Sequence, residues 1–376
     1  MAPNVVVAVA DDLDLERLPS YPQTDAGARQ QLELHLRRPA CSSRLAQCNY
    51  TAPNIESIGS RGVLFLGAHV PASVCTPSRY SVLTGRLPSS SPFFSGTLLG
   101  RRDDQVSISW NTYLEHGGGK LMCCGPGIEK PCSAPRVFGC RRRASTLGGM
   151  LQGAGYFTGF VGKWHVSSTP AELLQLHQGG RGKISVAQEQ AGRVASLNEL
   201  LTSTREQTLL PLVRAAGFNF SGAVSVGNVM DLDPIGLNYH NLDWEAEAAL
   251  RFLSLASGHV AAGRVAAFYL HFCTTLTHSP GPTRGICADP RLCQAGLLNE
   301  VAPYNRSLPE YDASHVLWLD DAIGALLTKL RSLRQEENTL FIFLGDHQRV
   351  GEHCTSRLRF EIVKSVGNFT VNRVFV

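Results

Sequence analysis

The sequence has no run of about 20 apolar residues, which is the length that an α-helix needs to cross a bilayer. Its longest apolar runs, Val5 to Ala10 and Val265 to Phe272, have the length of buried strands. We therefore predict a chain without a transmembrane segment. A basic-then-apolar leader is also lacking, so either a signal peptide has been removed or the amino terminus is incomplete.

The sequence also lacks a large excess of positive or negative charge. The formal net charge is only +4 over 376 residues, and the run from Arg141 to Arg143 is too short for a basic stripe. These features exclude a nucleic-acid-binding protein. Hydrophobic residues make up 43% of the chain and charged residues 18%, so the chain can bury a large core. We expect one large domain over residues 1–376.

Apolar runs that suit buried parallel strands alternate with helical patterns. The expected strands are Val5 to Ala10, Gly62 to Val70, Phe157 to Gly162, Val265 to Phe272 and Thr339 to Leu344. One expected helix runs from Asp243, a plausible cap, to Leu255, and another carries apolar residues at helical spacing from Val316 to Leu330. The alternation predicts an α/β fold with a mainly parallel central sheet flanked by helices.

Polar residues follow four of these expected strands. They are Asp11 and Asp12, then Lys163 and His165, then His278, and finally Asp346 and His347. Open α/β sheets place their sites at the carboxyl ends of the strands. The sequence therefore predicts that these side chains belong to one site.

The segment Cys75-Thr76-Pro77-Ser78-Arg79 carries the strongest single pattern. Pro77 suits the first turn of a helix, which places Cys75 at the amino-terminal end of that helix. The unpaired N–H groups there favour an anion, and Arg79 adds a positive charge one turn later. A cysteine in this place is a reactive thiolate, the precursor of another group, or half of a disulfide.

The longer segment Cys75 to Arg86 resembles, position for position, the signature C-x-P-S-R-x-x-x-L-T-G-R of the sulfatase family. The resemblance implies an alkaline-phosphatase-like sulfatase core. It also implies that Cys75 is oxidised to formylglycine by a formylglycine-generating enzyme before folding. The hydrated aldehyde would then attack sulfur, the alcohol would leave, and the second hydroxyl would allow sulfate to be expelled.

The adjacent carboxylates Asp11 and Asp12, together with Asp346 and His347, favour a hard divalent cation such as calcium or magnesium. Taken alone, an Asp-Asp pair after a strand is also typical of a solvated turn. The joint placement resembles the sulfatase metal site, in which the last ligand is commonly Asn and sometimes His. This resemblance implies one calcium ion held by Asp11, Asp12, Asp346 and His347, with residue 75 coordinating too.

The stretch from Gly155 to His165 resembles the family pattern G-Y-x-T-x-x-x-G-K-W-H. Positive charge and a proton carrier beside an anion are what group transfer from an acid ester requires. The resemblance implies that Lys163 binds sulfate and that His165 orients the diol together with Arg79. His278, in Thr-His-Ser-Pro, is similar to the family's histidine that faces and protonates the leaving oxygen.

The sequence departs from the family pattern near its end. After Asp346-His347, Gln348 stands where a glycine is usual, and no lysine occurs where the family places a sulfate-binding one. Arg357 is the nearest candidate for that contact. The chain also ends at Val376, whereas family members usually continue with a smaller carboxy-terminal subdomain, so that subdomain is expected to be missing or truncated.

The cysteines and the sequons favour the secretory pathway, with an extracellular or lysosome-like destination. The eleven cysteines are many for a cytosolic enzyme, and setting Cys75 aside leaves ten, enough for up to five disulfides. Four Asn-x-Ser/Thr sites indicate a glycoprotein and begin at Asn49, Asn219, Asn305 and Asn368.

The resemblance thus predicts a sulfuric ester hydrolase that acts on a sulfated small molecule or carbohydrate. Two other readings stay open. One is a phosphodiesterase or phosphonate monoester hydrolase of the same superfamily, which shares the cysteine motif and the metal ligands. The other is a catalytically inactive, sulfatase-like binding protein, which the absent lysine favours.

Overall fold

The structure is a computed structural model. It describes residues 2–13, 51–65, 68–72, 75–88, 146–166, 213–225, 242–278, 311–347 and 360–364, together with Leu18 and Leu209. All structural statements below refer to these residues.

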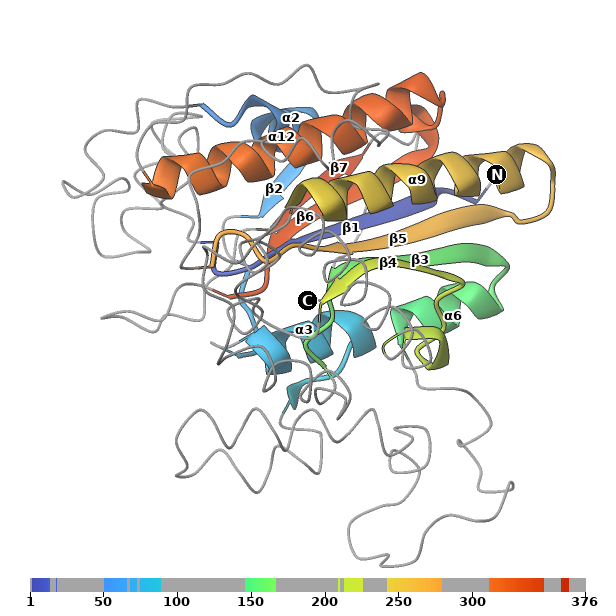
Figure 1. Ribbon diagram of the computed structural model, residues 1–376, viewed down its shortest axis with the longest axis horizontal. Coiled ribbons are helices and arrows are strands. Elements are labelled where there is room, and N and C mark those ends of the chain that lie inside the picture. The colour runs from blue at the N-terminus through green and yellow to red at the C-terminus, as the bar shows by residue number, and fades with distance from the viewer. Residues whose placement is uncertain are drawn as a thin grey trace, which may run out of the picture.

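A single seven-stranded sheet runs through the molecule (Figure 1). Its strands are β1 (Asn4–Ala10), β2 (Val63–Phe65), β3 (Tyr156–Lys163), β4 (Phe220–Ser225), β5 (Ala267–Cys273), β6 (Thr339–Gly345) and β7 (Phe360–Lys364). The order across the sheet is β2-β7-β6-β1-β5-β3-β4. The five strands from β6 to β4 pair in parallel, whereas β7 and β2 add an antiparallel edge. The predicted mainly parallel sheet is thereby confirmed.

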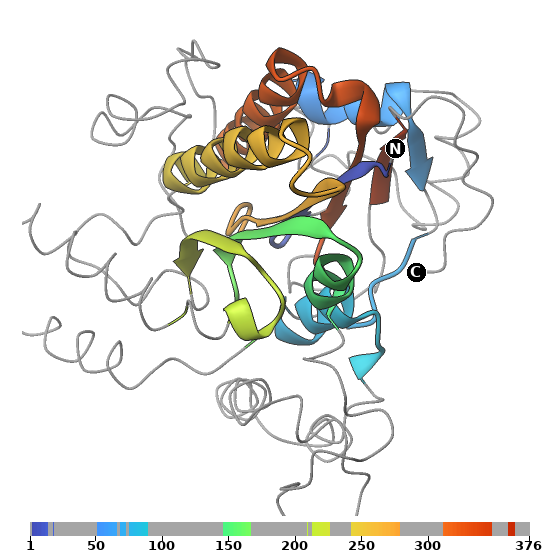
Figure 2. The same ribbon diagram turned by 90° about the vertical axis from the view of Figure 1, so that its right-hand side faces the viewer.

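Helices cover both faces of the sheet (Figure 2). They are α2 (Pro53–Arg61), α3 (Cys75–Thr84), α6 (Leu147–Gly153), α9 (Leu242–Ala261) and α12 (Tyr311–Ser332), with a 3-10 turn at Glu336–Asn338. Figure 1 shows α2, α9 and α12 on one side of the sheet and α3 and α6 on the other. Two apolar clusters result, one on each face. Because both faces are covered, the central strands are buried along almost their whole length, which is why they read as continuous apolar runs.

Four of the five expected strands are confirmed to within three residues, but the segment Gly62 to Val70 is not the buried parallel strand that the sequence suggested. Among the described residues of this segment, the strand is Val63–Phe65, and it pairs antiparallel with β7 at the edge of the sheet. Val63 is 44% exposed, as an edge position permits. Apolar content alone does not distinguish such an edge from a central strand.

The two expected helices are present and longer than predicted. Their apolar stripes are buried against the sheet, including Leu250 in α9 and Ile323 in α12, both 0% exposed. Asp243, however, is not the cap of α9, because the helix begins at Leu242. The Asp243 carboxylate instead accepts a 2.9 Å hydrogen bond from the indole of Trp318, which joins α9 to α12.

Gly162 occupies an irregular position at the end of β3. The pairing of β3 with β4 shifts register between Val161 and Lys163, and Gly162 has a positive φ of 94°. A Cβ added there would lie 1.9 Å from the backbone oxygen of Cys273 on β5. Only glycine fits both the conformation and the space. The irregularity directly precedes Lys163, one of the predicted site residues.

Two free, buried thiols are described, Cys75 and Cys273. The free thiol of Cys273 corrects the estimate of five disulfides, because eleven cysteines less these two leave nine, which allow four bridges at most. The nine lie outside the described residues, so the expected disulfides stay a prediction. None of the described helices is long and apolar enough to span a bilayer.

We predict that Gly162→Ala lowers the free energy of unfolding by at least about 3 kcal/mol, because the backbone of β3 or β5 must move to accept the methyl group. Gly258→Ala is the matched control. Gly258 lies inside α9 with open space around it, so alanine there is expected to stabilise by about 0.5–1 kcal/mol. Denaturant unfolding of both variants tests the pair. Equal stabilities for the two variants would contradict the close approach of β3 and β5.

Candidate active site

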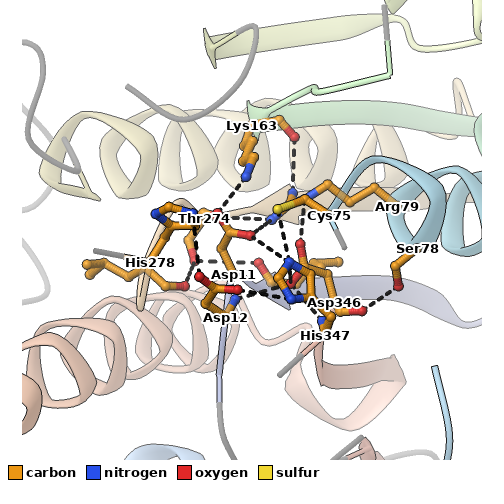
Figure 3. Close-up of polar contacts among 12 residues, drawn as sticks. Asp11, Asp12, Cys75, Ser78, Arg79, Lys163, Thr274, His278, Asp346 and His347 are labelled. Carbon is orange, nitrogen blue, oxygen red and sulfur yellow. Dashed lines mark hydrogen bonds and ion pairs between the residues drawn. The ribbon is translucent and has the colours of Figure 1, made fainter. Parts of the chain in front are cut away.

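Eight of the predicted site residues converge at the carboxyl ends of the parallel strands (Figure 3). Asp11 and Asp12 follow β1, Lys163 ends β3, His278 follows β5, and Asp346 and His347 follow β6. Cys75 and Arg79 reach the same place from the first turns of α3. The placement expected from the strand ends is therefore what the structure has.

Arg79 lies at the centre of the polar network. Its Nε is 2.8 Å from Asp346 Oδ2, and its Nη2 is 3.4 Å from Asp11 Oδ1. The guanidinium also donates hydrogen bonds of 3.2 Å to the backbone oxygens of Lys163 and Thr274. One side chain thus binds the ends of four strands, using the planar fork that a lysine lacks.

The Cys75 thiol faces this network from the amino-terminal end of α3. Its Sγ is 2.9 Å from Nε2 of His347, and Nδ1 of the same imidazole is 2.9 Å from Asp12 Oδ1. Cys75 is 9% exposed and His347 is buried. Burial, and then the charge of Asp11, raise the pKa of the thiol. The helix end brings residue 75 to the carboxylates, as Pro77 predicted.

The lysine of the site is buried completely. Nζ of Lys163 donates a 2.6 Å hydrogen bond to Asp11 Oδ2. Burial lowers the pKa of Lys163, but the Asp11 carboxylate outweighs it and holds the pKa above its ordinary value. Burial likewise raises the pKa of Asp11, and Lys163 and Arg79 together bring it well below the ordinary value. The lysine and this carboxylate are both charged.

The protonation states of Asp346 and His347, which follow β6, depend on the neighbouring carboxylates. Burial and the charge of Asp11 raise the pKa of Asp346 to about 6. Burial lowers the pKa of His347, but Asp346 and Asp12 raise it to about 12. The carboxylates around His347 therefore favour the protonated imidazole.

A divalent cation fits this cluster. Ligand atoms of Asp11, Cys75, Asp346 and His347 all lie within 4.8 Å of one another. Asp11 Oδ1 accepts no hydrogen bond in the described part of the chain, although it is completely buried. Arg79 Nη2 lies 3.4 Å from this oxygen, and coordination to a metal would stabilise the oxygen further. Asp12 is outside the set of four and contacts His347 instead.

The two other predicted histidines lie around this centre. His278, with 21% of its side chain exposed, has Nε2 at 3.4 Å from Asp12 Oδ2. His165 follows β3 with a φ of 47°, and its Nδ1 is buried without a hydrogen-bond partner among the described residues. Burial, and next the charge of Lys163, lower the pKa of His165 well below the ordinary value, so this imidazole is neutral. Arg357, predicted as a sulfate contact, lies outside the described residues.

Sequence reasoning missed the residues that brace the site. The hydroxyl of Ser78 donates to the backbone oxygen of Asp346, and the hydroxyl of Thr277 donates a 3.0 Å bond to the backbone oxygen of Asp12. Asp12 itself has a φ of 54°, a conformation that few side chains adopt and that clusters at functional sites. Ser78 and Thr277 belong to quoted motifs, but a motif does not say which backbone oxygen a hydroxyl will reach.

Comparison with known proteins decides the family. The model of the sulfatase family matches residues 3–173 and 249–362, which is most of the chain. The chain belongs to the sulfatase family. The expected family is thus confirmed, as is the expected mainly parallel sheet flanked by helices.

Two curated proteins that are similar to this chain are arylsulfatases by name. Human arylsulfatase A is 24% identical over 354 residues, which cover 92% of this chain and 52% of the relative. Human arylsulfatase G is 31% identical over 113 residues, 30% of this chain and 15% of that protein. This sulfatase thus spans about half the length of arylsulfatase A.

A solved structure concerned with glycosaminoglycan metabolism by Bacteroides thetaiotaomicron matches this sulfatase with a TM-score of 0.51 at 15% identity. The match covers 98% of this chain and 68% of that one. At this identity the likeness shows the fold.

We predict that Arg79→Lys lowers the free energy of unfolding by about 2–4 kcal/mol, because one ammonium cannot replace contacts to four strand ends and leaves buried carboxylates unpaired. Arg61→Lys is the matched control. Arg61 is 43% exposed and pairs with Glu336 at 2.8 Å, so its replacement is expected to cost less than about 1 kcal/mol. Denaturant unfolding compares the two. An Arg79→Lys variant as stable as the control would refute the central role of this guanidinium.

Proposed function

We propose that this sulfatase hydrolyses sulfate esters through a formylglycine made from Cys75, with one bound calcium ion. The observation that carries the proposal is the position of Cys75. It lies at the first residue of α3, with its Sγ 2.9 Å from His347, inside a buried cluster of carboxylates and cations. Membership of the sulfatase family supports the same chemistry.

The donor set supports the metal. Asp11, Asp346, His347 and residue 75, whose ligand atoms lie together, would hold the calcium ion, and Asp12, which adjoins them through its contact with His347, is our fifth candidate ligand. Most of these ligand atoms are oxygens once Cys75 is converted. The bound ion supplies Lewis acidity and a fixed template for the nucleophile and the sulfate group. Formylglycine supplies, after hydration, one hydroxyl as nucleophile and a second that lets sulfate depart, so the hydrolysis has two stages.

The other residues position charge around the reaction. Arg79 forms ion pairs with Asp346 and Asp11, which hold the three side chains in place. Its guanidinium also contributes positive charge near residue 75. Lys163 is buried next to Asp11 and would bind sulfate oxygens, where charge develops as the ester bond breaks. Burial of these groups excludes water and strengthens their electrostatic effect.

The two histidines of the strand ends have separate roles in this proposal. His278 is partly exposed beside Asp12, so it can meet an incoming ester and donate a proton to the leaving oxygen. His165 is neutral, and its Nδ1 has no hydrogen-bond partner in the described part of the chain, which suits a hydrogen bond to the hydrated residue 75. Arg357 remains our candidate for a further sulfate contact.

The substrate class follows from the relatives. Their names include arylsulfatase A and, in Bacteroides thetaiotaomicron, an N-acetylgalactosamine-6-O-sulfatase that is 26% identical over 45% of this chain and 21% of its own length. We propose a sulfated small molecule or carbohydrate as substrate. Maturation would require a formylglycine-generating enzyme. The four Asn-x-Ser/Thr sites support passage through the secretory pathway towards an extracellular or lysosome-like compartment.

We predict that the chain, made in a host that installs formylglycine and supplied with calcium, hydrolyses p-nitrophenyl sulfate in preference to bis(p-nitrophenyl) phosphate. Cys75→Ala is expected to lower kcat/KM at least about a thousandfold, because it removes the nucleophile. Cys273→Ser is the matched control, since Cys273 is the other buried free thiol among the described residues.

Release of p-nitrophenol under saturating and limiting ester concentrations measures each variant. Faster hydrolysis of the phosphate diester would favour the phosphodiesterase reading. Absence of turnover in a converted, folded chain would favour the binding protein. Equal losses in Cys75→Ala and Cys273→Ser would contradict the assignment of the nucleophile.

A further inference from the structure

A chain that folds with Cys75 unconverted has a different set of metal ligands from a converted chain. With Cys75 unmodified, the four groups whose ligand atoms lie within 4.8 Å of one another offer one sulfur, one imidazole nitrogen and two carboxylate oxygens. Calcium prefers six to eight oxygen ligands, whereas zinc prefers four ligands that include sulfur and nitrogen. Softer donors such as thiolates favour the transition metals. The unconverted donor set is therefore that of a zinc site.

The three distances from His347 Nε2 to the other ligand atoms are near those of four-coordinate binding. Nε2 of His347 lies 2.9 Å from Cys75 Sγ, 3.6 Å from Asp346 Oδ1 and 3.9 Å from Asp11 Oδ1. A tetrahedral zinc ion, with bonds of about 2.0–2.3 Å, places its ligand atoms about 3.3–3.8 Å apart. Movements of a few tenths of an ångström would bring these three distances into that range.

Neighbouring contacts hold the ligands in the required orientation. Nδ1 of His347 is 2.9 Å from Asp12, which turns Nε2 towards the thiol. Nζ of Lys163 binds Oδ2 of Asp11 and leaves Oδ1 without a hydrogen bond among the described residues. Contacts of this kind, made to the far side of each ligand, fix its geometry in metal sites and raise affinity about 10–100-fold. These four ligands are buried and held by neighbouring contacts, as in a metal-binding site and unlike a chance group of surface carboxylates.

We propose that the chain with an unmodified thiol at residue 75 binds a zinc-type metal ion through Cys75, His347, Asp11 and Asp346, and that conversion of Cys75 removes the sulfur ligand and turns the site towards calcium. On binding, the S–H bond breaks, its proton passes to solvent, and a sulfur–metal bond forms. The claim that conversion turns the site towards calcium rests on the function proposed above. The claim that the thiol form binds a zinc-type ion is independent of that function.

Cobalt(II), a spectroscopic substitute for zinc, tests the thiol form directly. The full chain is made in a host without formylglycine-generating activity, its intact thiol is confirmed by mass, and it is stripped of metal with a chelator. We expect one equivalent of Co²⁺ to produce a thiolate-to-cobalt charge-transfer band and the intense visible bands of four-coordinate cobalt. One equivalent of Zn²⁺ should abolish both, and a hundredfold excess of Ca²⁺ should leave them.

Variants identify the sulfur. Cys75→Ser is expected to lose the charge-transfer band and to bind Co²⁺ at least about tenfold more weakly. Cys273→Ser should retain both, because Cys273 is a buried free thiol outside the cluster. A thermal melt establishes that each variant is folded. If Cys75→Ser does not fold, the competition between Zn²⁺ and Ca²⁺ on the unmodified chain decides.

Three results would overturn the inference: no charge-transfer band in the unmodified chain, an unchanged band in folded Cys75→Ser, or displacement of Co²⁺ by Ca²⁺ at equal concentration. A converted chain that cleaves sulfate esters while its thiol form gives no band refutes this inference alone. A thiol form that gives the band, with a converted chain that cleaves no ester, refutes the proposed function and supports the metal site.

Discussion

The buried ion pairs of Arg79 are the interaction on which the rest of the site depends. This guanidinium meets the ends of β1, β3, β5 and β6 through Asp11, Lys163, Thr274 and Asp346. Four strands that are far apart in the sequence are thereby fixed to the first turns of α3, where Cys75 lies. Without the guanidinium, the carboxylates would repel each other in a region that excludes water. The parallel sheet supplies the positions of the strand ends, and Arg79 fixes the distances between them.

The same network leaves a buried carboxylate oxygen that a metal could bind, and this connects structure with chemistry. Lys163 binds Asp11 Oδ2 and Arg79 binds Asp346 Oδ2, whereas Asp11 Oδ1 lies 3.4 Å from Arg79 Nη2 and accepts no hydrogen bond among the described residues. A divalent cation at this point would satisfy the carboxylates and face residue 75. In our account, oxidation of the Cβ carbon of Cys75 to an aldehyde, with loss of the sulfur, then determines which cation the site prefers and whether the residue can act as a nucleophile.

The sequence predicted the central sheet and the meeting of its polar strand ends because buried parallel strands are nearly uniform in apolar content and their carboxyl ends share one edge. It did not reveal β4, whose Phe-Ser-Gly-Ala-Val-Ser run is short and mixed, or the antiparallel edge at β2. Asp243 resembled a helix cap, but its partner Trp318 is 75 residues away and invisible to a local pattern. The bracing hydroxyls of Ser78 and Thr277 were missed for the same reason. The roles of the site residues stay predictions.

The central claim is the conversion of Cys75, and a mass spectrum of the tryptic peptide that contains residue 75 tests it most directly. The protein should come from a host that installs formylglycine, with a control sulfatase converted in the same cells. Our account predicts a mass about 18 Da below that of the cysteine peptide, the change from thiol to aldehyde. An unmodified thiol beside a converted control would contradict the proposed nucleophile.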